Sequence, residues 1–478
     1  MFHLPARIFH AFCSKGLSFL AAVFFLAAFL YSCLNIEEAF SSKIKFGLIF
    51  FIFATGMLVI SYISYVFISK KLFLLLLILL SFSIRMIWVL KIHTPIQSDF
   101  AMIYGSAVSA AKGDFSFSKL PYFSSWVYQV GFTMYEACII KVVGEFPFIL
   151  KILNVIYSVG TTVFIYRITS KVFNEFCGRI AGTVYAFYIP SIIMSSVLTN
   201  EHLSTFLFYL GFYLLVSKGI QYKYTWLYIG ILLSLGDITR PLGAFVLLAV
   251  ILYVFVFSFI GSKTGEKSSI ITKFIGFIVA FYVVHYLVSY SFMAAGITSY
   301  PLSNREPYWK FVLGFNHGTV GQYSNEDAKY VSQFPIGNER DEREKQLVKE
   351  RITDKKKLAV LFKNKFKIMW GSNDASISWS LGTLNKPNLS NLFFMFERAY
   401  YMVMMAFAFV AAIVLCIKDE NKRFTLFLLL IIGYVCVHFL IEVQTRYRSF
   451  IIPSFAIIQS YGIYLVYRFL PIGSKLNK

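Results

Sequence analysis

The chain has 478 residues, of which 58% are hydrophobic and only 14% are charged, and its mean hydropathy is +0.67. This composition leaves too few polar side chains to cover a soluble domain, so it excludes a soluble enzyme and is typical of a polytopic membrane protein. The 45 Lys and Arg residues outnumber the 24 Asp and Glu residues, an excess that suits loops facing anionic lipid and does not indicate nucleic-acid binding.

Twelve apolar segments predict membrane helices, since a spanning helix needs about 20 mostly apolar residues. They cover residues 17–35, 46–69, 72–91, 147–168, 178–197, 202–217, 224–239, 242–261, 270–293, 392–416, 424–441 and 450–467. The expected fold class is therefore an all-α polytopic membrane protein with about twelve transmembrane helices. Six cysteines are scattered singly, a spacing that indicates neither a disulfide framework nor a metal site.

Loop charge predicts which way the chain crosses the membrane. Alternate short loops are basic, as at Lys70, Lys71 and Lys218, whereas the short loops on the other side carry Glu201 and Asp237. Because cytoplasmic loops are enriched in Lys and Arg, we expect a multi-pass protein of the plasma membrane with both termini in the cytoplasm.

Two longer segments, about 92–146 and 294–391, are not apolar enough to span, and by parity both lie outside. In the first, Asp99 precedes apolar residues at helical spacing, which predicts an N-cap and a short helix along the membrane surface; an amphipathic stretch, 127–143, follows. In the second, residues 314–331 indicate an ordered loop, and a solvated helix is expected to run into a basic surface helix near 355–367.

These segments divide the chain into four regions. Residues 1–71 hold two N-terminal membrane helices, and 72–293 hold a membrane core with the first outer loop. Residues 294–391 form the large outer segment, and 392–478 hold the last membrane helices.

Ionisable side chains gather at the predicted outer ends of different spans. They are Asp99, Glu201, His202, Asp237, Arg240, Glu442, Arg446 and Arg448. A carboxylate beside several fixed cations suits a lipid-linked anionic substrate, because the arginine fork matches phosphate oxygens and stays charged.

The order of these residues resembles the GT-C glycosyltransferases that use polyprenyl-phosphate sugars. That group includes the protein O-mannosyltransferases, the aminoarabinose transferases and the bacterial relatives of the RgtA/B/C/D-like group. The resemblance begins near Leu72 and rests on Arg85, Ser98-Asp99-Phe100, Tyr104, Pro190, Thr199-Asn200-Glu201, Thr239-Arg240-Pro241 and Glu442-Val443-Gln444-Thr445-Arg446-Tyr447. Two differences are that Phe100 replaces the second acid of the mannosyltransferases' Asp-Glu pair and that two extra helices precede the usual first span.

The resemblance implies a transfer from a polyprenyl-phosphate sugar to an acceptor hydroxyl, with Asp99 as the catalytic base and inversion at the anomeric carbon. Arg240, Arg446 and Arg448 are the expected donor-phosphate ligands. Other candidate site residues are Tyr104, Glu201, His202, Asp237 and Arg85. The acceptor, a cell-wall polymer, a lipid or a protein, stays open, as does a divalent cation; no cofactor is required by the residues themselves.

Each candidate also has a structural interpretation. Asp99 is also a good helix N-cap, Asp237 and Arg240 are spaced to form an ion pair, and Arg85 is close enough to the span end to snorkel. The remaining charges also suit plain interfacial positions, namely Glu201 and His202 at a helix start and Arg446 and Arg448 as membrane anchors.

Two other functions fit parts of the pattern. A transporter also has twelve spans with both ends inside, but its polar residues lie near the membrane midplane in repeated halves. A polysaccharide polymerase or ligase also uses lipid-linked sugars, but its decisive loop is expected late in the chain. The charged helix ends and the two long outer segments favour the glycosyltransferase.

Overall fold

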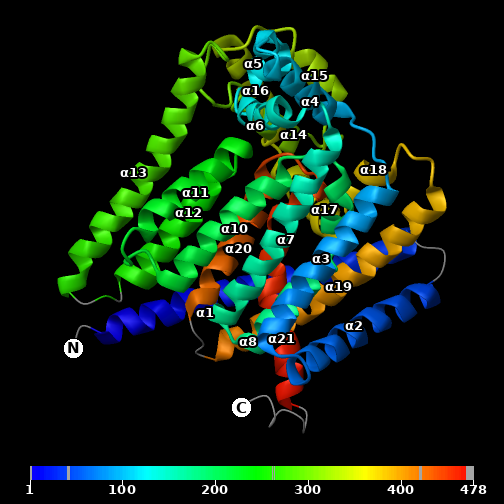
Figure 1. Ribbon diagram of the computed structural model, residues 1–478, viewed down its shortest axis with the longest axis vertical. Helices are drawn as coiled ribbons and strands as arrows, with labels where there is room; N and C mark the ends of the chain where they lie inside the picture. The colour runs from blue at the N-terminus through cyan, green and yellow to red at the C-terminus, as the bar shows by residue number, and fades with distance from the viewer. Residues whose placement is uncertain (1–2, 40–42, 261, 263, 419–421, 470–478) are drawn as a thin grey trace.

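The computed structural model describes residues 3–39, 43–260, 262, 264–418 and 422–469, and this part of the chain is built of helices (Figure 1). Within it the β-structure is one isolated bridge, between Trp126 and Asn304. Residues 1–2 and 470–478, for which a cytoplasmic location is predicted, lie outside the described residues. The all-helical membrane class predicted from composition agrees with this architecture.

Seven helices are long and apolar enough to cross a membrane within the described ranges. They are α1 (His3–Ala39), α2 (Lys43–Val66), α3 (Lys70–Lys91), α7 (Pro147–Val172), α13 (Thr264–Ala294), α19 (Pro387–Ile417), and α20 (Thr425–Leu440) with the short η4 (Lys422–Phe424) before it. An eighth span is formed if α8 (Glu175–Ala186) is joined to α9 (Ile189–Ile193) and η2 (Met194–Ser196), a pair bent by 55°. The twelve predicted spans are therefore not confirmed.

The other four predicted spans are helices too, but short ones. They are α10 (Glu201–Lys218), α11 (Thr225–Thr239), α12 (Gly243–Val254), which continues as the π-helical η3 (Phe255–Phe259), and α21 (Ile452–Phe469). Their lengths of 12 to 18 residues correspond to about 18–27 Å of helix at 1.5 Å per residue. That is less than the hydrocarbon core of about 30 Å. Most of α21 is buried by its neighbours, so its apolar residues serve the protein core as well.

The two segments predicted to lie outside the membrane meet on one side of the long helices and form a cap. Its helices are α4 (Ser98–Ala111), η1 (Ser116–Lys119), α5 (Pro121–Ser125), α6 (Gln129–Val143), α14 (Trp309–Gly314), α15 (Asn325–Val331), α16 (Asn338–Arg351), α17 (Lys355–Gly371) and α18 (Ser376–Leu381). The Arg305 amide donates to the Ser125 carbonyl (2.9 Å) and the Ser125 hydroxyl donates to Glu306 (2.7 Å), joining the two segments.

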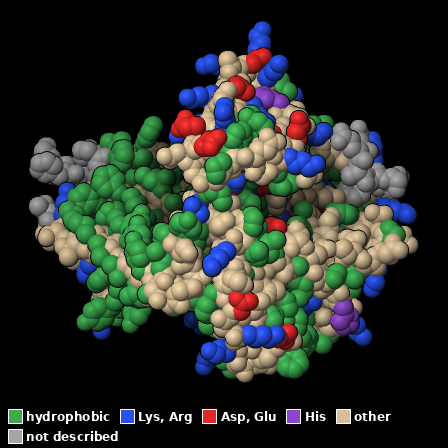
Figure 2. Space-filling model, turned by 90° about the horizontal axis from the view of Figure 1, so that it is seen from above, with side chains coloured by type: hydrophobic (Ala, Val, Ile, Leu, Met, Phe, Trp, Pro, Cys, Tyr) green, Lys and Arg blue, Asp and Glu red, His purple; other side chains and the backbone are tan. Residues whose placement is uncertain are grey.

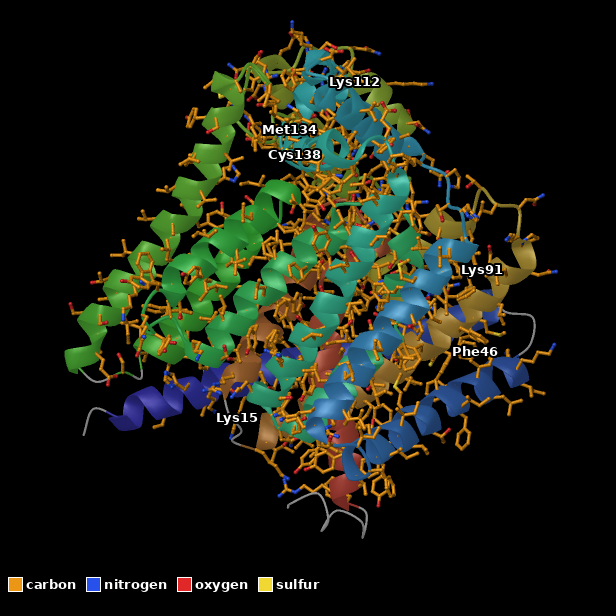
Figure 3. The ribbon with its side chains drawn as sticks, in the orientation of Figure 1. Lys15, Phe46, Lys91, Lys112, Met134 and Cys138 are labelled. Atoms are coloured by element: carbon orange, nitrogen blue, oxygen red, sulfur yellow. The ribbon has the colours of Figure 1, made fainter. Side chains whose placement is uncertain are left out.

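The figures show how the cap is placed. Lys112, Met134 and Cys138 lie in it, whereas Lys15 lies toward the opposite side, where α1 begins and α21 ends (Figures 1 and 3). Seen from above, the cap carries mixed acidic and basic side chains, and one flank is a continuous apolar surface (Figure 2). Exposed residues of α13 contribute to that flank, among them Ile271, Ile275, Val283 and Leu287. This division is that of a membrane belt beside an aqueous cap.

Three expectations for the cap are corrected. The apolar face of α4, with Ile103 and Ala107, packs on α6 and not on lipid. Residues 325–331, expected as loop, form α15 because Ser324 caps the helix by accepting a hydrogen bond from the Asp327 amide. The α17 helix is exposed at its start, as at Lys355 and Lys356, but its second half is partly buried, since Lys365 donates to main-chain carbonyl oxygens at the end of α20.

The first helix is central to the packing. Helix α1 runs along α19 and also contacts α17 and α20. The Phe24 ring meets Trp370 edge-on at 5.0 Å, and Phe25 meets Phe455 edge-on at 5.5 Å. Aromatic contacts of this kind add to the area that each ring buries, so α1 is part of the main hydrophobic core.

Candidate active site

A buried carboxylate between two arginines lies where three helix ends meet beneath the cap. Glu201 is 4% exposed, and its Oε1 lies 3.1 Å from Nη1 of Arg240 and 3.5 Å from Nε of Arg446. Glu201 begins α10, Arg240 follows the last residue of α11, and Arg446 belongs to η5 (Thr445–Phe450). The interpretation of Glu201 as a plain interfacial residue at a helix start is therefore wrong, because it is buried between the two arginines.

The local sequence explains how Arg240 reaches this point. Pro241 excludes the helical conformation for the residue before it, and Arg240 has φ −150° and ψ 124°, so α11 ends there. The Asn200 side-chain amide donates to the Thr239 carbonyl at 2.9 Å, which ties the start of α10 to the end of α11. The backbone therefore brings Glu201 and Arg240 together.

Aromatic rings hold the Arg446 guanidinium. Its central carbon lies 4.6 Å from the Trp379 ring centre and 5.1 Å from that of Phe100. Arg240 and Arg446 both face the Tyr447 ring, at 5.6 and 5.9 Å. Planar guanidinium groups are attracted to aromatic faces, so the rings restrain the two cations while leaving their N–H groups directed elsewhere.

A second ion pair extends the site toward the cap. Lys310 of α14 donates to Glu442, whose carboxylate also accepts from Tyr447 (3.3 Å) and Gln444 (3.1 Å). Burial lowers the pKa of Lys310, but Tyr447 and Glu442 outweigh it and hold that pKa above its ordinary value. Burial also raises the pKa of Tyr128 to about 12, so its phenol stays protonated. The sequence did not single out Lys310 or Tyr128, since nothing in their neighbourhoods marks them; only the fold does.

Asp99 lies in the first turn of α4 and is exposed. Burial is the largest cause that raises the pKa values of Tyr122 and Tyr128, and the charge of Asp99 also raises both. Asp99 is next in sequence to Phe100, which supports Arg446. The N-cap interpretation is wrong, because Gln97 occupies that position, and among the described residues none donates a hydrogen bond to Asp99. Ser98 has φ +54°, a strained value for a residue with a side chain, and turns the chain at this point.

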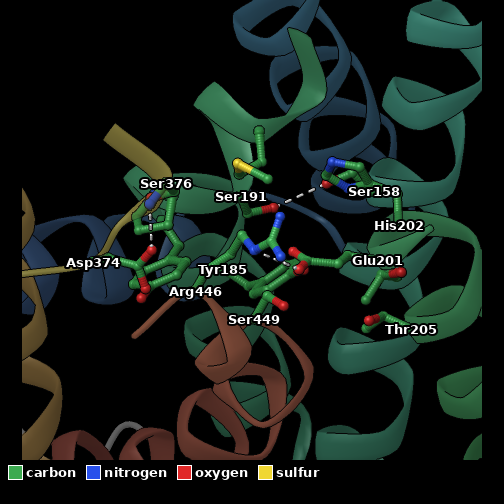
Figure 4. A pocket seen from close by; sticks show the side chains of 14 residues that line it. Ser158, Tyr185, Ser191, Glu201, His202, Thr205, Asp374, Ser376, Arg446 and Ser449 are labelled. Atoms are coloured by element: carbon green, nitrogen blue, oxygen red, sulfur yellow. Dashed lines mark hydrogen bonds and ion pairs between the residues drawn. The ribbon is translucent and has the colours of Figure 1, made fainter. Parts of the chain in front are cut away.

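A narrow crevice surrounds Arg446 and is lined by residues of α7, α9 and α10 on one side and by Asp374 and Ser376 on the other (Figure 4). The volume available to the centres of water molecules in this crevice is about 30 Å³. That is room for about two water molecules. Several buried polar atoms on its walls have no hydrogen-bond partner in the described structure: Glu201 Oε2, His202 Nε2, Tyr188 OH, Ser376 Oγ, Ser449 Oγ and Arg446 Nη1. Buried polar atoms are normally satisfied, so this crevice is suited to water or to a polar group of a ligand.

Arg448 lies apart from this cluster. It is fully buried and lies 3.3 Å from Asp374 and 3.8 Å from Glu397. With two carboxylates around it, Arg448 is already neutralised and is neither a free membrane anchor nor placed beside Arg240. The expectation that it joins a phosphate site with Arg240 is corrected by this geometry.

Three other predicted residues also lie elsewhere. Arg85 neither snorkels nor contacts the cluster, because it is buried and donates to Ser158 (2.7 Å) and to the Ala186 carbonyl (3.0 Å) at the bend between α8 and α9. Asp237 lies 3.4 Å from His285 and accepts from the Gly243 amide, so its predicted ion pair with Arg240 does not form. Tyr104 packs with the apolar residues between α4 and α6.

The chemistry of the cluster favours an anion. Glu201 is shared by two guanidinium groups, those of Arg240 and Arg446, whereas Lys310 has its own carboxylate, Glu442. The same part of the chain holds no group of three or more His, Cys, Asp or Glu residues arranged to bind a metal ion. No known protein-family model matches the chain, and no curated protein is a significant relative. The residues and their geometry therefore carry the functional argument.

Proposed function

We propose that the protein is a glycosyltransferase that moves a sugar from a polyprenyl-phosphate donor to an acceptor hydroxyl at the outer face of the plasma membrane. The observation that carries this proposal is the Glu201–Arg240–Arg446 cluster beneath the cap. The exposed Asp99 is next in sequence to Phe100, whose ring contacts Arg446. A GT-C-like arrangement with cytoplasmic termini is part of the same proposal, since the cap then faces the side on which lipid-linked sugars are used.

The proposed reaction is a direct displacement at the anomeric carbon. Asp99 accepts the proton of the acceptor hydroxyl, the acceptor oxygen forms the new bond, and the bond to the phosphate oxygen breaks with inversion. The leaving phosphate takes the electron pair, and Arg240 and Arg446 stabilise the charge that develops on it. Lys310, which is paired with Glu442, and Tyr128 are assigned the role of orienting the acceptor.

A transporter is the alternative with a specific observation behind it, namely the bent α8–α9 span. Broken spans in carriers expose backbone groups to a substrate. Here Arg85 occupies the bend and donates to the Ala186 carbonyl, so a side chain of the protein satisfies the backbone. A polymerase or ligase differs from the proposal mainly in the acceptor, which would be a growing polysaccharide chain.

The experiment uses purified protein in lipid nanodiscs with a panel of radiolabelled polyprenyl-phosphate sugars. Transfer or slow donor hydrolysis with one sugar, lost in Arg240→Ala, supports the proposal. Arg167→Ala is the matched control, since Arg167 is an exposed arginine of α7. Turnover of none of the donors, together with uptake of a labelled sugar into proteoliposomes, would establish the transporter instead.

A further inference from the structure

Lys365 of α17 is a buried lysine whose hydrogen-bond partners are main-chain carbonyl oxygens. It is 1% exposed, and its ammonium group donates to the carbonyls of Gly314 (2.7 Å), Phe439 (2.7 Å) and Ile441 (2.9 Å). An ammonium group has three N–H donors and no acceptor, so the three carbonyls match its full donor capacity. The charged form of this side chain therefore joins three points of the main chain.

The three carbonyls belong to two parts of the chain that meet at Lys365. Gly314 is the last residue of α14 in the cap, whereas Phe439 and Ile441 lie at the end of α20. The carbonyls in the last turn of a helix have no donor within that helix, and a cation near them is stabilised. Lys365 supplies donors at the end of α20 and links that end to the cap.

Two glycines allow the chain to come this close. A Cβ atom at Gly314 would lie 2.1 Å from the carbonyl oxygen of Leu440, and one at Gly321 would lie 2.8 Å from Cε of Lys365. Gly321 also has φ +78°, a conformation that favours glycine. The cap loop that follows α14 therefore packs directly against the lysine side chain and the end of α20.

The segment that Lys365 holds leads into the candidate active site. Beyond Ile441, the amides of Glu442 and Val443 donate to main-chain carbonyls of the cap, at 3.0 and 2.7 Å. Three consecutive residues are thus fixed by α17 or the cap. Arg446, one of the two arginines of the site, follows three residues later. The place of its backbone depends on these ties.

The number of donors on Lys365 depends on its proton. A neutral amine has two N–H groups and a lone pair, which would face the third carbonyl oxygen and repel it. Burial lowers the pKa of Lys365 from 10.5 to about 7, so the proton is lost as the pH rises through that value. The other titratable or charged groups on the elements around it are Tyr31 of α1, Lys310 and His317 of the cap, His438 of α20, and Glu442, Arg446 and Tyr447 after α20.

We propose that Lys365 is a positioning residue of the candidate active site, whose protonated side chain holds residues 441–446 in place and makes anion binding by Arg446 depend on pH. The inference rests on the proposed function only for the identity of that anion as the donor phosphate. When the proton is lost, one carbonyl is released and the segment that carries Arg446 moves more freely. The site therefore binds an anion more tightly when Lys365 is protonated, and a bound anion in turn favours the protonated lysine.

Hydrogen exchange of residues 439–447, followed by mass spectrometry on the full chain in nanodiscs, tests the tie without any reaction. Rates are corrected for the intrinsic pH dependence of amide exchange. Protection in the wild type should fall about fivefold or more between about pH 6 and about pH 8.5, which bracket the pKa of Lys365. Lys365→Met keeps the length but removes the donors and the proton, so its protection should be low at both pH values. Lys363→Met, at an exposed lysine of the same helix, should behave like the wild type.

Anion binding is measured by calorimetry with farnesyl methyl phosphate, a phosphodiester that keeps one negative charge over this pH range. Its affinity for the wild type and for Lys363→Met should fall about fivefold or more from the lower to the higher pH. Lys365→Met should bind weakly at both. Equal protection and equal affinity of the wild type at the two pH values would overturn the proposal without any variant. The same pH dependence in Lys365→Met would also overturn it, because the other titratable groups are unchanged there.

Donor hydrolysis, measured in parallel, separates this inference from the proposed function. Equal turnover by the wild type and Lys365→Met at both pH values refutes the positioning role alone. Absence of turnover with every donor, while protection and probe binding still depend on Lys365, refutes the proposed reaction alone.

Discussion

Replacing Glu201 by Gln tests whether one carboxylate holds the two arginines of the candidate site. The substitution keeps the size of the side chain and removes its charge. At 3.1 and 3.5 Å, each ion pair is worth about 5 kcal/mol at an effective dielectric constant of about 20. The desolvation of Glu201 and the repulsion between the arginines offset much of this, and removing one member of a buried pair costs about 3–5 kcal/mol.

The expected change in melting temperature follows from the size of the chain. The unfolding entropy is about 2.1 cal/mol/K per residue, or about 1 kcal/mol/K for this chain. Glu201→Gln should therefore lower the Tm by about 3–5 °C. Because Arg240 and Arg446 then lack their counter-ion, inorganic pyrophosphate should raise the Tm of the variant by more than it raises that of the wild type.

Thermal unfolding in detergent, followed by the fluorescence of a thiol-reactive or intrinsic probe, measures both effects. Glu145→Gln is the matched control, because Glu145 pairs with Lys112 at 2.6 Å but both side chains are at least half exposed. Exposed pairs contribute about 0–1 kcal/mol, so its Tm should shift by about 1 °C or less. An unchanged Tm in Glu201→Gln, with no added response to pyrophosphate, would refute the assignment of the two arginines to an anion site.

Four further outcomes follow from the structure. Asp99→Asn should lower transfer about 100-fold or more without changing the Tm, since the carboxylate is exposed and caps no helix; near-normal turnover would remove Asp99 from the mechanism. Arg240→Lys should lower the turnover number less than Arg240→Ala, because charge survives but the fork does not; equal activities would contradict a bidentate contact. Arg85→Leu leaves several buried acceptors unpaired at about 1–3 kcal/mol each and should abolish a monodisperse size-exclusion peak. Burial raises the pKa of Glu136 in α6 from 4.5 to about 8, so the wild type should lose stability as the pH rises from about 4.5 to 8, and a Tm series should show a flatter profile for Glu136→Gln.

The helices could be predicted from the sequence because apolar periodicity is a local property. Each predicted span coincides with helix in the described residues, but hydropathy does not tell a helix buried by protein from one buried by lipid. That the short helices α10 and α21 span the membrane therefore stays a prediction. The amphipathic stretches that became α4 and α6 were also recognised, although their apolar faces pack on each other. The sequence of an apolar helix face does not show whether lipid or another helix will cover it. In the fold, α4 and α6 cover each other.

The candidate site shows the same limit residue by residue. Arg446 and Arg448 are two positions apart in a 3₁₀-helix, where three residues make a turn, so they point in different directions. The sequence predicts the same phosphate-binding role for both. In the structure, Arg446 lies against Glu201, whereas Arg448 lies between Asp374 and Glu397. Lys310 was missed because it is one cation among many in a long segment.

The sequence by itself determined that this protein is a helical membrane protein, and that its charges lie at the ends of helices from distant parts of the chain. Pro241 even determined where α11 stops, since its effect on Arg240 is local. Only the tertiary structure decided which charges meet. Electrostatic attraction depends on the distance between charges in space. The ends of α10, α11 and η5 come together through the packing of whole helices, and this packing cannot be read from the residues next to each charge in the sequence.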